Sequence, residues 1–265
     1  TAQDTWNFDQ WAAEWGQISI LSAKEVMQYR GIKTADEIAQ MFPMIRARAS
    51  STVNATRSKH GVRTLPGHVE VTNTRRPYAQ YFALDEFDLR HTKFDGSMSD
   101  TVTRAVFRAP DAALVLPYDP HTDRVLLVEQ IRFGPFARGD QTLWQLEPVA
   151  GRLDAGEQPE QAARREMMEE AGLALKEMHP VGEVYCFPGT SSEFYYLYLG
   201  IADLPDLTTR IGGLTAENED IRSHVIGFED LMQLCDRFEV ANAPILILAF
   251  WLARHRGRLQ TAAGK

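Results

Sequence analysis

The chain has 265 residues and lacks the features that mark several large classes of protein. Its 2 cysteines, Cys186 and Cys235, are too few for a disulfide framework and form no zinc-type cluster with histidine, so we expect a reducing compartment. No continuous apolar run reaches the length that spans a membrane. The N-terminus lacks the basic and then apolar order of a signal peptide, although Thr1 stands where an initiator methionine is expected. A cytoplasmic protein without a membrane partner is the simplest expectation.

The chain also contains fewer basic residues than acidic residues. The chain carries 28 Lys and Arg against 36 Asp and Glu, which gives a formal net charge of -8. Proteins that hold nucleic acid through its phosphates need a basic surface, so no nucleic-acid partner is expected. The 7 histidines show no ligand spacing such as HxxxH, so the sequence predicts no histidine metal site.

The chain does have 44% hydrophobic residues, enough for one full core and a modest extra element. Near the N-terminus, apolar residues recur at three- and four-residue steps and predict two helices: Phe8, Trp11, Ala12 and Trp15, then Ile38, Met41, Phe42 and Ile45. Pro43 is expected to kink or end the second helix. Such stripes either bind a partner or, more often, cover a core, so we expect an extension docked on the rest of the chain or on a dimer mate. Residues 50–60 are polar and turn-prone and predict a linker.

Short alternating segments follow from Val69 onward and predict strands separated by turns. The expected strands cover residues 81–89, 101–107, 113–118, 124–131, 181–187, 193–199 and 224–228. An amphipathic helix is expected at 243–255.

The most informative stretch is residues 151–173. Pro159 suits the first turn of a helix, where its missing N–H costs nothing, and Gly172 is a typical helix end. Between them, Glu166 is related to Glu169 and Glu170 by i, i+3 and i, i+4. An α-helix therefore places the three carboxylates side by side on one face.

Two interpretations of this cluster are open from the residues alone. Adjacent like charges destabilise a bare helix, and Arg165 alone cannot balance three carboxylates. A divalent cation would neutralise them, and hard oxygen ligands of this kind suit Mg²⁺ or Mn²⁺. Glu-rich patterns are, however, also common on solvated helix faces.

The spacing of the whole stretch resembles the Nudix box at every position. Its fixed residues are Gly151, Glu157, Arg165, Glu166, Met167, Glu169, Glu170, Gly172 and Leu173. A signature with so many fixed positions is far more specific than a lone glycine-rich motif. Further segments at 94–96, 116–120, 128–132, 144–151, 187–193 and 217–221 are similar to those of bacterial ADP-ribose pyrophosphatases, including the branch associated with tellurite resistance. This similarity extends over residues 68–256, and Pro188 stands where that subfamily carries a proline.

The resemblance implies an α/β protein with the Nudix α/β/α sandwich of mixed sheets. It also implies a homodimer in which antiparallel strands ahead of the core are exchanged between subunits. We therefore expect three parts: a helical N-terminal extension at residues 1–60, the exchanged antiparallel strands at 61–108, and the catalytic domain at 109–265.

The implied activity is metal-dependent hydrolysis of the diphosphate linkage of ADP-ribose to AMP and ribose 5-phosphate, with water as the nucleophile. By matching positions, Glu166 and Glu170 are the expected ligands of Mg²⁺, or of Mn²⁺, with Glu169 as an additional ligand and the Ala150 carbonyl as a backbone ligand. Arg165 is expected to orient the carboxylates rather than to touch substrate.

Each of two other glutamates has two alternative roles. The match to the ADP-ribose enzymes favours Glu193 as general base, on a flexible turn at 188–192 that closes over substrate; otherwise Glu193 merely begins a strand in solvent. Glu157 either holds a water of the metal shell or makes a structural hydrogen bond.

For the substrate, Arg132 matches an arginine that contacts the diphosphate, although alone it could equally be a surface residue. Arg104 and Tyr81 match positions that hold adenine, the tyrosine by stacking. Glu147 either binds a ribose hydroxyl or pairs with Arg132. The chain departs from the family at Ala105, where an acidic residue is usual, and this puts adenine selectivity in question.

Two alternative functions follow from these observations. Ala105 motivates a pyrophosphatase of another nucleotide sugar, such as GDP-mannose. The second alternative is a Nudix-fold sensor that binds ADP-ribose without turnover, which the intact box disfavours.

Overall fold

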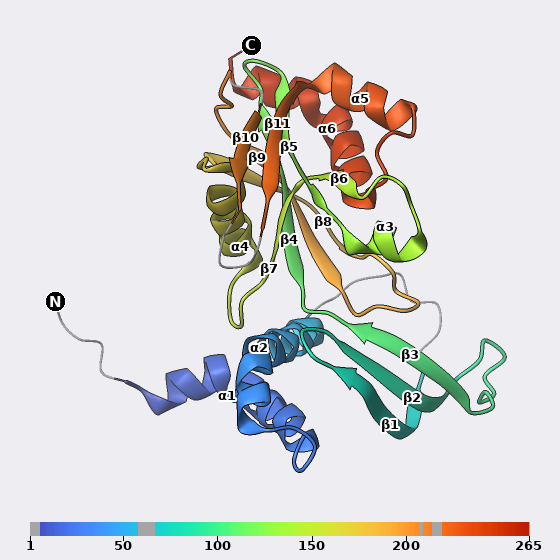
Figure 1. Ribbon diagram of the computed structural model, residues 1–265. Helices are drawn as coiled ribbons and strands as arrows, with labels where there is room; N and C mark the ends of the chain where they lie inside the picture. The colour runs from blue at the N-terminus through green and yellow to red at the C-terminus, as the bar shows by residue number, and fades with distance from the viewer. Residues whose placement is uncertain (1–5, 58–66, 207–208, 214–218, 265) are drawn as a thin grey trace. The chain divides into compact units, whose positions relative to one another are not determined.

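The computed structural model describes residues 6–57, 67–206, 209–213 and 219–264 (Figure 1). These residues divide into two compact units. The N-terminal unit contains the chain as far as Asp111 together with two returning loops, Leu153–Glu157 and Tyr185–Phe194. The sandwich unit contains Ala112–Arg152, Gln158–Val184 and Tyr195–Lys265.

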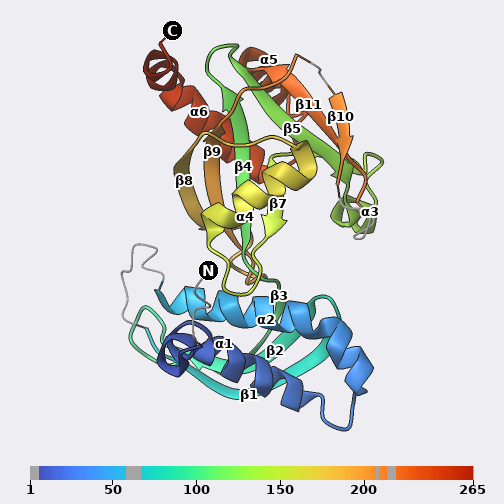
Figure 2. The same ribbon diagram turned by 90° about the vertical axis from the view of Figure 1, so that its left-hand side faces the viewer.

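The N-terminal unit consists of two helices and a three-stranded antiparallel sheet in the order β1-β2-β3. Its elements are α1 (Phe8–Gln28), α2 (Ala35–Arg57), β1 (Val69–Ala79), β2 (Ala83–His91) and β3 (Val102–Arg108). The two helices lie together along one face of this sheet (Figure 2). Tyr29, Met41, Ile45 and Ala79 form the core between them, with Val26 and Ile38 packed against it. The two predicted helices are therefore confirmed, and Ile38, Met41 and Ile45 of the second apolar stripe pack in this core, whereas Phe8, Trp11 and Phe42 are exposed.

Helix α2 does not end at Pro43, one of the two outcomes expected there, and it extends through residues 50–57 of the expected linker. The helix contains Pro43 and continues to Arg57, and residues 58–60 lie outside the described part of the chain. The polar residues that suggested a linker are satisfied within the unit. Ser51 donates its hydroxyl to the Ala47 carbonyl at 3.2 Å, and Asn54 donates to the Asp111 carboxylate at 3.1 Å. Local composition could not reveal these partners, because Asp111 is remote in sequence.

Buried ion pairs join the helices to the sheet. Arg48 of α2 is buried and its Nη2 lies 2.5 Å from Oε1 of Glu25 in α1. Arg76 of β1 pairs with Asp85 of β2 at 2.5 Å, and its Nη1 lies 2.9 Å from the same Glu25 oxygen. Removing one partner of such a pair would leave an uncompensated buried charge, so the pairs fix the arrangement of these four elements.

The sandwich unit is built on an eight-stranded mixed sheet. The main path runs β10-β11-β5-β4-β9-β8, with β6 beside β5 and β7 beside β4. Strand β9 runs parallel to β4, whereas β5 and β7 run antiparallel to it. The strands are β4 (Ala112–Asp119), β5 (Arg124–Ile131), β6 (Trp144–Glu147), β7 (Val149–Arg152), β8 (Glu177–Tyr185), β9 (Phe194–Ile201), β10 (Thr209–Gly212) and β11 (Ile221–Gly227).

Helices cover both faces of this sheet. Helix α4 (Pro159–Glu166) and the π-helical turn η1 (Met167–Ala171) lie on one face, and α5 (Phe228–Asp236) and α6 (Ala243–Ala262) lie on the other (Figures 1 and 2). A short helix, α3 (Phe133–Arg138), follows β5. The predicted α/β/α sandwich is confirmed. Elements α3, α5 and β10 were not predicted from the sequence; α3 and β10 have six and four residues, which carry too little periodicity.

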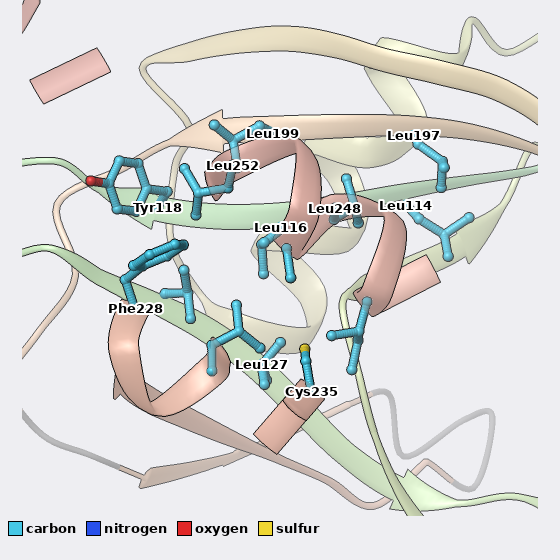
Figure 3. Close-up of a cluster of buried hydrophobic side chains, with 14 of the residues drawn as sticks. Leu114, Leu116, Tyr118, Leu127, Leu197, Leu199, Phe228, Cys235, Leu248 and Leu252 are labelled. Carbon is cyan, nitrogen blue, oxygen red and sulfur yellow. The ribbon is translucent and has the colours of Figure 1, made fainter. Parts of the chain in front are cut away.

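The main core lies between the sheet and the helices α5 and α6. Figure 3 shows leucines of β4, β5 and β9 facing Phe228, Cys235, Leu248 and Leu252 of the two helices. Every residue of β4 is buried, as expected for a strand covered on both faces. Cys235 is one of these core residues. Among the described residues, no helix is long and apolar enough to cross a membrane.

Candidate active site

The box helix begins and ends where the sequence predicts. Gln158 caps α4 with Gln161 in a reciprocal capping box, and Pro159 occupies the first turn. Gly172 ends the helical segment with a left-handed φ of 65°. The last turn, η1, is a π-helix rather than the expected continuation of an α-helix, and π turns of this kind are frequent at functional sites.

The three box carboxylates occupy different environments. Glu170 is 3% exposed, whereas the side chains of Glu166 and Glu169 are 13% and 28% exposed. Burial raises the pKa of Glu170 to about 9, with a further contribution from the charge of Glu166. Burial also raises the pKa of Glu166 to about 7, against the opposing effect of Arg165. Two buried carboxyl groups that disfavour their charged forms are the arrangement expected where a cation completes the site.

Arg165 holds two of these carboxylates. Its Nη1 lies 2.6 Å from Oε1 of Glu166 and 3.1 Å from Oε2 of Glu169, and its Nη2 donates to the Arg152 carbonyl at 3.1 Å. The guanidinium therefore joins the box helix to the end of β7. In the described ranges, no group of three or more His, Cys, Asp or Glu is already gathered tightly enough to hold an ion. This agrees with the guanidinium binding Glu166 and Glu169.

Strand β7 supplies the backbone beside the carboxylates. The amide of Ala150 donates to Oε2 of Glu170 at 3.4 Å. A Cβ atom at the next residue, Gly151, would lie 1.7 Å from Oε1 of Glu166, so only glycine lets this carboxylate lie against the strand. Gly212 of β10 has a similar role, because a Cβ there would lie 2.2 Å from the Glu170 carbonyl oxygen. Gly151 was recognised from the sequence pattern. Gly212 was not, because its close approach to the Glu170 carbonyl arises from tertiary packing.

Glu219 is an acidic neighbour to which the sequence analysis assigned no role. Its charge contributes to the raised pKa of both Glu166 and Glu170, which places a fourth carboxylate near the pair. In the sequence, Glu219 could have been identified as a candidate site residue from its position in residues 217–221, which resemble the corresponding segment of the ADP-ribose pyrophosphatases.

Arg132 and Glu147 form a hydrogen-bonded pair at the adjoining strands β5 and β6. Both Nε and Nη2 of Arg132 donate to Oε2 of Glu147, at 2.8 and 2.5 Å, and Asn242 donates to the other oxygen at 3.1 Å. Burial disfavours the charged guanidinium, but the hydrogen bond and charge of Glu147, with the charge of Glu170, raise the pKa of Arg132 overall. Glu147 is thus paired with Arg132, one of the two alternatives considered for it, and the Arg132 side chain as a whole remains 41% exposed.

The other candidate residues belong to the N-terminal unit. Tyr81 is 52% exposed in the turn between β1 and β2, with its ring edge-on to Phe82. Arg104 lies on β3 opposite Phe87 and donates to the Thr103 carbonyl at 2.9 Å. The carboxylate of Glu157 accepts the amide of Asp154 at 2.9 Å, which is the structural hydrogen bond considered for it.

Glu193 also belongs to the N-terminal unit and immediately precedes β9. Its amide donates to the Ser191 hydroxyl at 3.1 Å. The preceding turn is bonded to β3, because Phe107 donates its amide to Thr190 at 2.8 Å and accepts the amide of Ser192 at 2.9 Å. These backbone bonds connect the turn, which was expected to be flexible, to β3.

Comparison with known proteins identifies the class to which this fold and carboxylate cluster belong. The chain matches the NUDIX domain family over residues 108–248, more than half of its length, and it belongs to the Nudix family. A solved structure described as an ADP compounds hydrolase has a TM-score of 0.54 and 17% identity, and the alignment covers 71% of this chain and 95% of that chain. This second similarity supports the fold alone.

Several curated proteins have sequences similar to this chain. The chain is 40% identical over 192 residues to the ADP-ribose pyrophosphatase of Escherichia coli (strain K12), covering 72% of this chain and 91% of that protein. It is 34% identical over 194 residues to the ADP-ribose pyrophosphatase of Haemophilus influenzae, covering 72% and 89%. The GDP-mannose pyrophosphatase of Enterobacter sp. (strain 638) is 28% identical over 184 residues, covering 69% and 94%.

Proposed function

We propose that this Nudix enzyme hydrolyses the diphosphate linkage of ADP-ribose to give AMP and ribose 5-phosphate. The observation that carries the proposal is the buried pair Glu166 and Glu170 beside Gly151, in a fold that belongs to the Nudix family. The identity to two ADP-ribose pyrophosphatases supports the choice of substrate.

The residues at the box fit a divalent cation. Glu166 and Glu170 supply hard oxygen atoms, and burial raises the pKa of both carboxyl groups, a setting in which a cation would offset the disfavoured negative charge. Glu169, the Ala150 carbonyl and Glu219 are the further candidate ligands, with Mg²⁺ as the expected ion and Mn²⁺ as a substitute. A bound cation would neutralise the negative charge that develops on the phosphate oxygens.

The chain's own side chains then have separate tasks. Arg165 keeps Glu166 and Glu169 oriented through its two contacts. Arg132, whose side chain is partly exposed, binds the diphosphate, and Glu147 orients its guanidinium while Asn242 donates to Glu147. We assign Glu193 as the general base that accepts the proton of the attacking water.

The adenosine end is assigned to the N-terminal unit. Tyr81 offers an exposed ring on which adenine can stack, and Arg104 offers donors to the base. We infer a homodimer in which strands of residues 61–108 are exchanged between subunits, with residues 1–60 as an added helical extension, 109–265 as the catalytic domain, and the cytoplasm as the location.

One observation favours a second substrate class. Ala105 replaces the acidic residue usual in the subfamily, and relatives named GDP-mannose pyrophosphatases are also similar to this chain. Loss of one hydrogen-bonding partner for adenine would relax selectivity toward other nucleotide sugars.

A substrate panel tests the proposal. Phosphomonoester release from ADP-ribose, GDP-mannose, NADH and diadenosine polyphosphates should be measured with Mg²⁺ and with EDTA. We expect the highest kcat/KM for ADP-ribose and no turnover in EDTA. A higher kcat/KM for GDP-mannose would move the assignment to the second class, and binding of ADP-ribose without turnover of any substrate would indicate a sensor.

A further inference from the structure

The helices of the N-terminal unit contact the loop at the start of the Nudix box. This box loop, Leu153–Glu157, belongs to the N-terminal unit although it joins β7 to α4. The amide of Gly156 donates to the hydroxyl of Ser50 in α2 at 3.2 Å. A Cβ atom at Gly156 would lie 2.6 Å from Cη2 of Trp15 in α1, and the residue has a φ of +82°. The loop therefore carries a glycine where both the backbone conformation and the indole exclude a side chain.

A second group of contacts fixes the beginning of the same loop. Leu153 donates its amide to the carbonyl of Asp111 at 3.0 Å. The backbone amide of Asp111 in turn donates to the hydroxyl of Ser51 at 2.8 Å, and its carboxylate accepts a hydrogen bond from the side-chain amide of Asn54 at 3.1 Å. Asp111 is buried, so these bonds satisfy polar groups that would be costly to leave unpaired.

Trp15 is itself held in position within the unit. The guanidinium of Arg46 in α2 lies over the indole ring, 5.0 Å from its centroid. Trp15 is half-buried, in contrast to Trp6, which is 72% exposed just before the same helix. The contact with Gly156 therefore comes specifically from the indole ring of Trp15.

We propose that Trp15 and Ser50 are positioning residues that hold the box loop for catalysis. The inference rests on the proposed metal-dependent hydrolysis. The loop leads directly into Gln158, the cap of α4, and α4 carries Arg165 and Glu166. Arg165 also bonds to the Arg152 carbonyl immediately before the loop. Fixing the loop restricts the N-terminal end of the helical segment that presents the box carboxylates, and it also restricts Glu157.

This role belongs to a part of the chain outside the matched family domain. Trp15 and Ser50 precede residues 108–248, so the family domain does not itself include them. The contacts of Trp15 and Ser50 with the box loop would thus give helices α1 and α2 a part in the proposed hydrolysis. Loss of residues that orient metal ligands commonly lowers metal affinity or activity by about 10- to 100-fold.

The test compares Trp15→Ala, Trp15→Phe, Ser50→Ala and the matched control Trp6→Ala in the full-length protein. Hydrogen exchange of a peptide spanning residues 153–158 should be followed without metal. We expect faster exchange in Trp15→Ala and Ser50→Ala, and wild-type exchange in Trp6→Ala. Trp15→Phe should recover most of the protection because an aromatic ring still covers Gly156.

Turnover of ADP-ribose should then be measured against Mg²⁺ concentration in the same variants. We expect the Mg²⁺ concentration for half-maximal rate to rise by about tenfold in Trp15→Ala, with the KM for ADP-ribose changed much less and thermal unfolding still cooperative. Wild-type exchange of the loop together with wild-type Mg²⁺ dependence in Trp15→Ala would overturn the proposal. Absence of turnover in wild type would instead contradict the proposed function, and the exchange data would still decide whether the loop is held.

Discussion

Replacement of Glu170 by glutamine should stabilise the metal-free protein at neutral pH while removing its turnover. The wild-type carboxyl is almost fully buried and its pKa is raised to about 9 from an ordinary value of 4.5. Between these two values the folded state binds more protons than the unfolded state, so the free energy of unfolding falls as pH rises. Glutamine is neutral throughout and keeps an acceptor for the Ala150 amide.

The magnitude follows from the pKa. At pH 7 the wild-type chain must retain a proton that it would release when unfolded, and the interval from 4.5 to 7 corresponds to about 3 kcal/mol at about 1.4 kcal/mol for each pH unit. At pH 5 the same cost is below about 1 kcal/mol. The variant should therefore exceed wild type by a few kcal/mol at pH 7, and the difference should nearly vanish at pH 5.

Urea unfolding in EDTA at the two pH values measures this difference. Added Mg²⁺ should stabilise wild type by mass action and stabilise Glu170→Gln far less, so the gap should shrink or reverse. Equal free energies of unfolding for wild type and Glu170→Gln at pH 7 in EDTA would refute the account of Glu170 as a desolvated carboxyl group beside that of Glu166. A difference of the same size at both pH values would also refute it.

Other variants test separate parts of the account. Gly151→Ala should lower kcat/KM by about 100-fold or more with an unchanged circular dichroism spectrum, because its methyl group would displace Glu166; wild-type turnover would contradict this geometry. Arg132→Ala should raise the KM for ADP-ribose by about tenfold or more, since a hydrogen bond to a charged group contributes about 1.5 to 3 kcal/mol; an unchanged KM would remove Arg132 from the diphosphate site. Leu248→Ala should cost about 2 to 5 kcal/mol in urea unfolding with an unchanged KM, and a loss below about 1 kcal/mol would show that the core can collapse around it.

Local stereochemistry explains which features could be predicted. Pro159 and Gly172 act through their own backbone preferences, so the limits of the box helix were evident without its surroundings. The alternating segments likewise located β4, β5 and β9. The π turn at 167–171 was not evident from the sequence, and in the structure it lies close to β10, because a Cβ at Gly212 would lie 2.2 Å from the Glu170 carbonyl oxygen.

Tertiary partners explain the main errors. Ser50 and Asn54 made residues 50–60 resemble a linker, yet their polar groups bond to Gly156 and Asp111. Both partners are distant in sequence, so a local pattern could not distinguish a solvated linker from a polar face that holds two loops. Glu219 was overlooked for a similar reason, because its significance lies in its effect on Glu166 and Glu170.

The initial rate of phosphomonoester release from ADP-ribose, measured for wild type and Glu170→Gln in Mg²⁺ and in EDTA, tests the central claim most directly. We predict rapid release only for wild type with Mg²⁺, and a loss of about 100-fold or more in the variant even at saturating Mg²⁺. Release that is equal in EDTA, or that persists in Glu170→Gln, would contradict metal-dependent hydrolysis at the Nudix box.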